Sequence, residues 1–276
     1  AVMAARLGAR NAEIVTCVGN DGFGDETVRN FAVCGMGGAG VMRAPEPTGV
    51  APIWVDGDGE NRILIVNGAN DCLLPAHVAD GTTPTGRMVQ QAKLVVCQLE
   101  INAETTLAAL RNAKASGGVT ILNPAPAKEK LAGAFYEHAD IVAPYQSEAE
   151  ILTGCSCDSI DGARAAARKL LECGAHCVVM TLGAKGCLSS LGVGEADMAV
   201  VSAPSIPKSS VVDTSGAGDC FLGAFAYSLS QGAATQAELM HMDRLKEAAL
   251  FACRAATLSV QGKGTQSSYP AKEDLL

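Results

Sequence analysis

Short apolar segments alternate with helical segments along most of this chain of 276 residues. From about residue 76 onward, mainly apolar runs such as 94–98, 119–122 and 177–181 are separated by segments with helical periodicity. A continuously apolar strand is buried on both faces, and a strand–helix–strand unit places its two strands in parallel. The pattern therefore predicts an α/β fold of three layers, αβα, with a mainly parallel sheet.

The alternation also predicts individual elements. The expected strands are 14–18, 94–98, 119–122, 140–143 and 177–181. The expected helices are 1–8, 24–34 with Asp25 as its cap, 103–116, 147–152, 161–173, 219–230 and 239–260. Two β-like runs, 49–55 and 62–66, do not fit this rhythm, and the turn-rich segment 56–61 between them is typical of a hairpin. We expect residues 1–276 to form a single domain with this lid hairpin, within about 49–66, as a small projection.

Composition excludes several classes of protein. Hydrophobic residues make up 48% and charged residues 18%, which excludes a disordered chain. The longest apolar runs are shorter than the roughly 18 to 20 residues that a membrane span needs, so we expect no membrane contact. The net charge of −8 and the 4% aromatic content argue against nucleic acid as a partner. The 11 cysteines lie scattered in apolar runs, which predicts free thiols and a cytoplasmic location.

A glycine-rich loop carries the clearest chemical signal. Gly216, Ala217 and Gly218 directly precede an apolar helix, with Asp219 in its first turn. Unpaired N–H groups and the positive end of the helix dipole then favour an anion, such as a phosphoryl group in transfer. A carboxylate beside that anion can accept a proton from an attacking hydroxyl. Taken alone, the pattern is equally compatible with an ordinary turn whose aspartate stabilises the helix dipole.

The loop from Asp213 to Asp219 resembles the C-terminal signature of the ribokinase-like carbohydrate kinases. Other segments resemble the same family in collinear order, namely Thr48-Gly49-Val50-Ala51, Gly59-Glu60-Asn61-Arg62-Ile63, Cys97-Gln98-Leu99-Glu100, Asn123-Pro124-Ala125-Pro126-Ala127 and Lys263-Gly264-Thr265-Gln266. The resemblance covers essentially the whole chain. The Gln-Leu-Glu and Asn-Pro-Ala-Pro-Ala elements favour the ribokinase branch over the adenosine kinase and fructokinase branches.

The resemblance implies transfer of a phosphoryl group from ATP to the 5-hydroxyl of D-ribose, which gives ribose 5-phosphate and ADP. It implies that Asp219 is the catalytic base and also contacts the sugar, and that Gly216, Ala217 and Gly218 form the anion hole. Glu100 is implied to hydrogen-bond the ribose. The implied ATP-binding residues are Tyr145, Thr181, Leu182, Gly183, Ala184, Lys185, Gly186, Gly218 and Cys253.

The resemblance also implies two cations. A monovalent cation, K+, is implied at Asp213, Ser215, Ser259, Gly262, Gly264 and Ser268. Their carbonyl and hydroxyl oxygens, with Asp213 as the one full charge, suit a large and weakly charged ion. Mg2+ is implied to be bound indirectly through Glu148, which belongs to the helix-start motif Asn-x-x-Glu.

The sequence departs from the family pattern at three places. Tyr145 stands where the motif has Asn, and Cys253 stands where the family has an Asn beside the adenine edge. The chain also begins inside a helical pattern, so we expect the family's first strand and its Gly-Gly-Lys-Gly-Ala-Asn segment to precede residue 1 in a longer protein. These departures keep open a kinase for another small sugar or nucleoside, or a non-catalytic nucleotide-binding fragment.

Weaker motifs point elsewhere. The pattern of Gly35 to Gly40 matches a dinucleotide fingerprint, but it follows a helix and leads to a strand, which is the wrong context for an NAD-dependent oxidoreductase. The cysteines near 155–157 and 173–177 lack a histidine at zinc-ligand spacing, so buried thiols are favoured over zinc. An isolated hairpin leaves an edge and a face uncovered, and we therefore expect a homodimer through residues 49–66.

Overall fold

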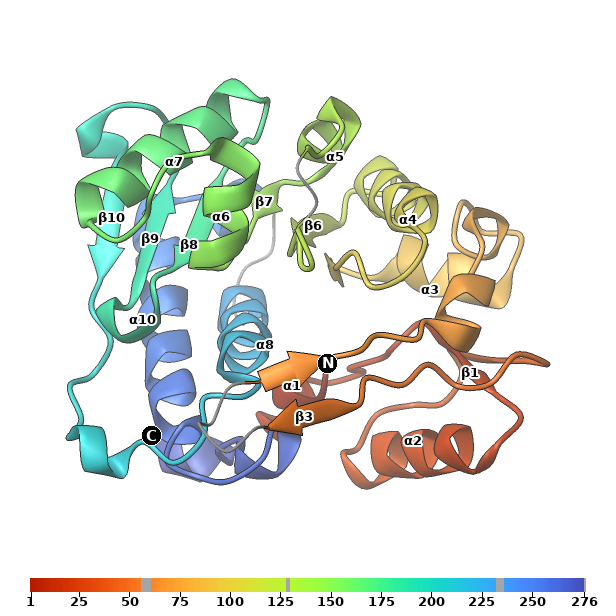
Figure 1. Cartoon of the computed structure of the whole chain (residues 1–276). Coiled ribbons are helices and arrows are strands. Elements are labelled where there is room, and N and C mark those ends of the chain that lie inside the picture. The colour runs from red at the N-terminus through yellow and green to blue at the C-terminus, as the bar shows by residue number, and fades with distance from the viewer. Residues whose placement is uncertain (56–60, 128–129, 232–235, 276) are drawn as a thin grey trace.

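The computed structural model describes residues 1–55, 61–127, 130–231 and 236–275 (Figure 1). Its main sheet has six strands in the order β10-β9-β8-β7-β6-β5. The strands are β5 (Leu94–Cys97), β6 (Val119–Leu122), β7 (Ile141–Val142), β8 (Val178–Thr181), β9 (Cys187–Ser190) and β10 (Met198–Val201). Strands β5 to β8 are parallel, and β9 and β10 are antiparallel to their neighbours. The predicted mainly parallel sheet is confirmed.

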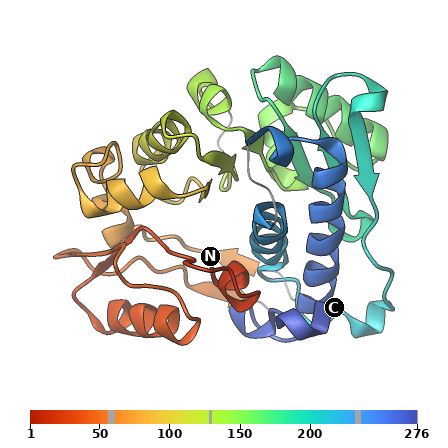
Figure 2. The same ribbon diagram turned by 180° about the vertical axis from the view of Figure 1, so that it is seen from behind.

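Helices cover both faces of this sheet. On one face lie α4 (Ala103–Ala115), α5 (Gly133–His138), α6 (Gln146–Thr153) and α7 (Ile160–Glu172). On the other lie α1 (Val2–Arg6), α8 (Ala217–Ser230), α9 (Gln236–Leu239) and α10 (Met242–Ser259). Figure 1 shows α6 and α7 in front of β8 and β9, and Figure 2 shows α10 in front when the molecule is seen from behind. None of the described helices is both long and apolar enough to span a bilayer.

Neighbouring residues of one strand contribute to two separate cores. In β6, Ile121 packs among α1, α8 and α10, whereas Leu122 packs among α4 to α7. In β9, Cys187 belongs to the same core as Ile121, and Leu188 belongs to the same core as Leu122. All four side chains are fully buried. This alternation follows from the period of two along a strand and explains why neither face of these strands is exposed to solvent.

Residues 16–44 form a smaller αβ unit. Strand β1 (Thr16–Gly19) pairs in parallel with β2 (Val41–Ala44), and α2 (Gly22–Val33) connects them. Asp21 caps α2, because its side chain accepts the N–H of Gly24 at 2.8 Å. The prediction that Asp25 is the cap was therefore wrong by one turn, since Asp25 already lies in the first turn of the helix.

The expected hairpin is present between this unit and α3 (Pro84–Gln91). Strands β3 (Ile53–Val55) and β4 (Asn61–Ile63) are antiparallel, and Val50 and Val66 form a further bridge. They form a two-stranded sheet apart from the main one. Of the connector predicted at 56–61, residues 56–60 lie outside the described residues, and Asn61 belongs to β4. Short 3-10 helices complete the chain at Gly68–Cys72, Pro75–His77, Gly183–Lys185, Glu195–Asp197, Lys208–Ser210, Gln266–Ser268 and Lys272–Leu275.

Candidate active site

The amino end of α8 is the centre of the site. Gly216 precedes this helix with a φ of 72°, a left-handed conformation that favours glycine. The N–H groups of Gly218 and Asp219 find no acceptor among the residues that the structure describes. Asp219 lies in the first turn with its side chain exposed. Free donors and the positive end of the helix dipole thus lie beside a carboxylate.

Two loops support this helix end. The Asp213 carboxylate accepts the N–H of Ser215 and the N–H of Gly264, both at 2.9 Å, and so ties the glycine loop to the C-terminal segment. Tyr269 donates its hydroxyl proton to the carbonyl of Gly216 at 3.3 Å. The pKa of Asp213 is lowered by these N–H donors. Sequence reasoning missed Tyr269, because a lone tyrosine beyond the last helix gives no periodic signal.

Neither of the loop's glycines has room for a side chain. A Cβ at Gly216 would lie 3.1 Å from Cβ of Thr265 and 3.2 Å from the hydroxyl of Tyr269. A Cβ at Gly218 would lie only 2.6 Å from the ring of Tyr145. The glycines therefore allow close packing around the helix end.

Tyr145 contacts the expected base directly. Its hydroxyl donates a hydrogen bond to Oδ1 of Asp219 at 3.0 Å. Burial raises the pKa of Tyr145, and the negative charge of Asp219 and the hydrogen bond to it raise that pKa further. The phenol therefore stays protonated and remains a donor near neutral pH. The sequence showed that Tyr145 departs from the family motif, but it could not show this contact.

Glu100 lies on the same side of the molecule as Asp219. It follows β5 at the carboxyl end of the strand, and its backbone N–H is bonded to the side chain of Gln98. Burial of its carboxylate by neighbouring protein raises its pKa, and the charge of Asp219 adds to the effect. The residue is nevertheless exposed to solvent by surface area, so it is open to a ligand. Two carboxylates close enough to interact suit the binding of a polyhydroxylated sugar.

The predicted nucleotide loop follows β8 at the same edge of the sheet. Thr181 bridges to Tyr145, and its N–H is bonded to the carbonyl of Pro144 at 3.2 Å. Gly183 and Gly186 both have positive φ, at 56° and 99°. Lys185 donates to the carbonyl of Asp158. Leu182 is buried and Ala184 lies in the turn between the two glycines, so the loop presents backbone rather than bulky side chains.

Glu148 lies in the first turn of α6 and was expected to act on Mg2+ indirectly. Burial raises the pKa of its carboxyl group, and the backbone N–H of Tyr145 is among the donors that oppose this shift. Its Oε2 atom is buried and has no hydrogen-bond partner among the described residues. A buried carboxylate oxygen without a donor fits a hydrated divalent cation.

The residues expected at the monovalent cation come from two adjoining loops. Asp213 and Ser215 belong to the first, and Gly262, Gly264 and Ser268 to the second. Both are joined by the Asp213–Gly264 bond and by the N–H of Val212, which is bonded to the carbonyl of Val260 at 2.8 Å. Ser259 is buried at the end of α10, with its hydroxyl bonded to Ala256. The loops are thus adjacent, as a shared ion requires.

Cys253 lies in the core. It is buried on α10, and its thiol is hydrogen-bonded to that of Cys187 in β9. This bond lowers the pKa of Cys253 and raises that of Cys187. Contact of Cys253 with an adenine remains a prediction.

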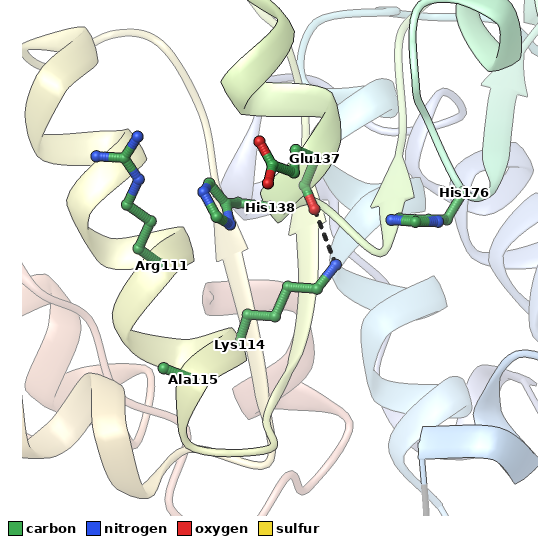
Figure 3. Close-up of a pocket in the computed structure, with 6 residues that line it drawn as sticks. All are labelled: Arg111, Lys114, Ala115, Glu137, His138 and His176. Carbon is green, nitrogen blue, oxygen red and sulfur yellow. Dashed lines mark hydrogen bonds between the residues drawn. The ribbon is translucent and has the colours of Figure 1, made fainter.

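A pocket of about 460 Å³ lies at the opposite edge of the sheet (Figure 3). It is lined by Arg111, Lys114, Ala115, Glu137, His138 and His176, which precede the amino ends of β6, β7 and β8. Lys114 is 3.2 Å from Asp140 and donates to the carbonyl of Glu137 at 2.9 Å, as the dashed line in Figure 3 marks. This pocket shares no residue with the site at α8.

The weaker motifs of the sequence involve other residues than the site at α8. Residues 35–40 lie between the end of α2 and the start of β2, so the helix-then-strand context that argued against a dinucleotide fold is confirmed. Within the described ranges, no three His, Cys, Asp or Glu side chains are arranged to hold a metal ion. All eleven cysteines are free thiols.

Comparison with known proteins identifies the family of this chain. The chain matches the family model of the pfkB family carbohydrate kinases over residues 1–272. It is 40% identical to a ribokinase of Mus musculus over 277 residues, covering 99% of this chain and 80% of the mouse protein. It is 38% identical to a deoxyribokinase of Salmonella typhi over 274 residues, covering 99% of this chain and 83% of that protein.

Solved structures agree with the sequence matches. The ribokinase from Thermotoga maritima superposes with a TM-score of 0.81 at 33% identity, covering 100% of this chain and 83% of that chain. The Arabidopsis thaliana ribokinase complexed with ribose and ATP superposes with a TM-score of 0.84 at 28% identity, again covering 100% and 83%. The fold is that of the ribokinase-like kinases, and the chain belongs to the pfkB family of carbohydrate kinases.

Proposed function

We propose that this protein is a ribose kinase that transfers the γ-phosphoryl group of ATP to the 5-hydroxyl of D-ribose. The observation that carries the proposal is the amino end of α8, where free N–H groups lie beside Asp219 and within the influence of Glu100. The likeness to the mouse ribokinase, and to the Arabidopsis ribokinase complexed with ribose and ATP, supports the choice of substrates.

The proposed reaction is a single displacement. The sugar hydroxyl oxygen attacks the γ-phosphorus, and the bond between that phosphorus and the bridging oxygen of ADP breaks. The hydroxyl proton passes to Asp219. The free N–H groups of Gly218 and Asp219 stabilise the charge on the transferring group, since phosphoryl transfer depends mainly on position and charge.

Glu100 is proposed to accept a hydrogen bond from a ribose hydroxyl. The loop 181–186 is proposed to carry the nucleotide, because its backbone is accessible at the carboxyl edge of the sheet. Cys253, which is buried in the core, is proposed to lie near the adenine.

Two cations belong to the proposal. Mg2+ neutralises charge on the nucleotide phosphates, and the orphan oxygen of Glu148 is proposed to act on it through water. The Escherichia coli kinase structure in complex with ATP and Mg2+ shares this fold at 24% identity, which supports the fold alone. K+ is proposed between the loops of Asp213 and Gly264.

We also propose that residues 1–276 form one domain with a lid over the sugar. We propose further that two copies of the chain form a homodimer through the lid hairpin. Leu64, Ile65 and Val66, at the end of the hairpin, are 53%, 60% and 47% exposed. Three adjacent apolar side chains in water favour a partner surface. The cytoplasm is the proposed location, on the grounds of the cysteine pattern.

The choice of sugar is tested by comparing sugars as substrates. The likeness to the Salmonella deoxyribokinase makes 2-deoxy-D-ribose the comparison that matters most. Each sugar is incubated with ATP and Mg2+, and the products are identified by phosphorus NMR. The proposal predicts ribose 5-phosphate and a higher kcat/KM for ribose. A higher kcat/KM for deoxyribose, or phosphorylation of adenosine instead, would overturn the choice of ribose.

A further inference from the structure

We propose that Tyr145 is a positioning residue for the base, and that its phenol holds the Asp219 carboxylate in the orientation that accepts the substrate proton. The inference rests on the proposed function of the site as a kinase centre. It assigns a role to the residue that departs from the family motif.

The backbone of Tyr145 is fixed from both sides. It bridges to Thr181 at the end of β8, and it precedes α6, whose Ala149 donates its N–H to the Tyr145 carbonyl at 3.0 Å. The Tyr145 backbone N–H is bonded to the Glu148 carboxylate. A side chain on a backbone fixed in this way can adopt few orientations. Its hydroxyl group can therefore hold a partner in a defined position.

The phenol ring occupies the gap between β7–α6 and α8. Its Cε1 and Cζ atoms lie 2.6 Å from the place that a Cβ of Gly218 would take. The ring therefore packs on the glycine loop without closing over the exposed Asp219 side chain. An amide in place of the phenol would be shorter by a whole ring and could not bridge from the same backbone position to α8.

The hydroxyl selects one oxygen of the base. It donates to Oδ1 of Asp219 at 3.0 Å, and Oδ2 has no partner among the described residues. Without this bond an exposed carboxylate in the first turn of a helix rotates freely. With the bond, Oδ1 is held and Oδ2 is the oxygen left to accept the proton of the incoming hydroxyl. The raised pKa of the phenol keeps it a donor and prevents it from competing as a base.

Tyr145→Phe tests the role because it keeps the ring on Gly218 and removes only the hydroxyl. We expect kcat to fall about tenfold or more, which corresponds to one hydrogen bond to a charged group. The KM values for ATP and sugar should change less than twofold, and the melting temperature should fall by only about 2–4 °C, as expected for one lost hydrogen bond in a domain of this size. Tyr227→Phe is the matched control, because Tyr227 is a buried tyrosine further along α8, the helix that carries Asp219, and it should keep the parent kcat.

Three results would overturn the inference. An unchanged or higher kcat in Tyr145→Phe would show that the hydroxyl does not position the base. A rise in KM for ATP with kcat intact would place the phenol in nucleotide binding instead. Equal losses in Tyr145→Phe and Tyr227→Phe would show a general effect of losing a hydroxyl.

A second measurement does not depend on turnover. Tyr145→Phe, Asp219→Ala and the double variant form a thermodynamic cycle in the unfolding midpoint. The structure predicts that the two single shifts do not add, because each variant removes the same hydrogen bond. Additive shifts would contradict the contact. If the parent protein shows no kinase activity with any sugar while the cycle is non-additive, then the proposed function fails and the contact stands.

Discussion

Asp219 occupies the first turn of α8, where a carboxylate meets both a helix dipole and free N–H donors. Its environment is defined by a few neighbours: Tyr145 holds one oxygen, Glu100 contributes a nearby charge, and Tyr269 supports the preceding loop. Each neighbour comes from a distant part of the chain. The chemistry at this residue therefore depends on the tertiary structure rather than on the local motif alone.

Asp219→Asn should remove nearly all turnover and leave ATP binding intact. An amide cannot accept the hydroxyl proton, and a general base contributes about 10²- to 10⁴-fold to rate. The measurement is kcat beside calorimetric titration with ATP. The control is Asp161→Asn, which changes an aspartate with a 90% exposed side chain in the first turn of α7. Turnover within twofold of the parent protein would remove Asp219 from the role of base.

Gly218→Ala should reduce both turnover and stability. The new methyl group would lie 2.6 Å from the ring of Tyr145, so the ring must move and give up its bond to Asp219. Overpacking of this kind costs about 1–3 kcal/mol of unfolding free energy. Gly133→Ala is the control, since nothing lies within 4 Å of a Cβ there. Tyr145→Ala should cost less stability in Gly218→Ala than in the parent protein, because it also relieves the clash, and equal costs would refute the clash as the cause.

At the level of elements, the sequence predicted the strands and helices whose apolar residues follow a clear pattern. The apolar strands β6 and β8 and the amphipathic helix α7 were placed within a residue or two. The antiparallel strands β9 and β10 and the polar helix α3 were not anticipated. Strand β9 includes Ser189 and Ser190, which are buried but look like turn residues, so only tertiary pairing identifies it. The contacts among distant elements, such as Tyr145 to α8, have no local signal.

The base of the lid hairpin is anchored by one carboxylate. Asp21 accepts the Thr48 N–H at 2.8 Å and the Thr48 hydroxyl at 2.6 Å, and also caps α2. These donors lower the pKa of Asp21 below its usual 3.8. A lowered pKa adds stability that is present above pH 3.8 and is lost as the pH falls through the folded-state value.

Asp21→Asn should therefore lower the melting temperature at neutral pH, and the difference from the parent protein should shrink below about pH 4. Asp25→Asn is the matched control, because that aspartate neither caps the helix nor contacts Thr48. The measurement is thermal unfolding at a series of pH values. A difference that stays constant down to pH 2, or that grows in acid, would contradict this account of the anchor.

At the level of the whole molecule, the parallel strands bring the site together at one edge. Glu100 follows β5, Tyr145 follows β7 and the nucleotide loop follows β8, and the carboxyl ends of parallel strands share one edge of a sheet. The strand–helix alternation predicts this convergence from the sequence. The side-chain contacts within the edge required the structure.

The proposed dimer depends on the exposed end of the lid hairpin. Ile65→Lys places a charge in the apolar patch of Leu64, Ile65 and Val66 and should give a monomer in sedimentation at micromolar concentration, where the parent protein should sediment as a dimer. Val33→Lys changes a residue that is 81% exposed on α2 and should leave the dimer intact. A monomeric parent protein would exclude the lid as a dimer interface at that concentration.

ADP release by this chain, with ATP, Mg2+ and K+, tests the central claim most directly when it is measured with and without D-ribose. The account predicts release that depends on ribose and that Asp219→Asn abolishes. Release that is equal with and without the sugar, or that survives Asp219→Asn, would contradict a ribose kinase centred on α8. If the chain binds ATP but releases no ADP with any sugar, the site is a nucleotide-binding site without transfer.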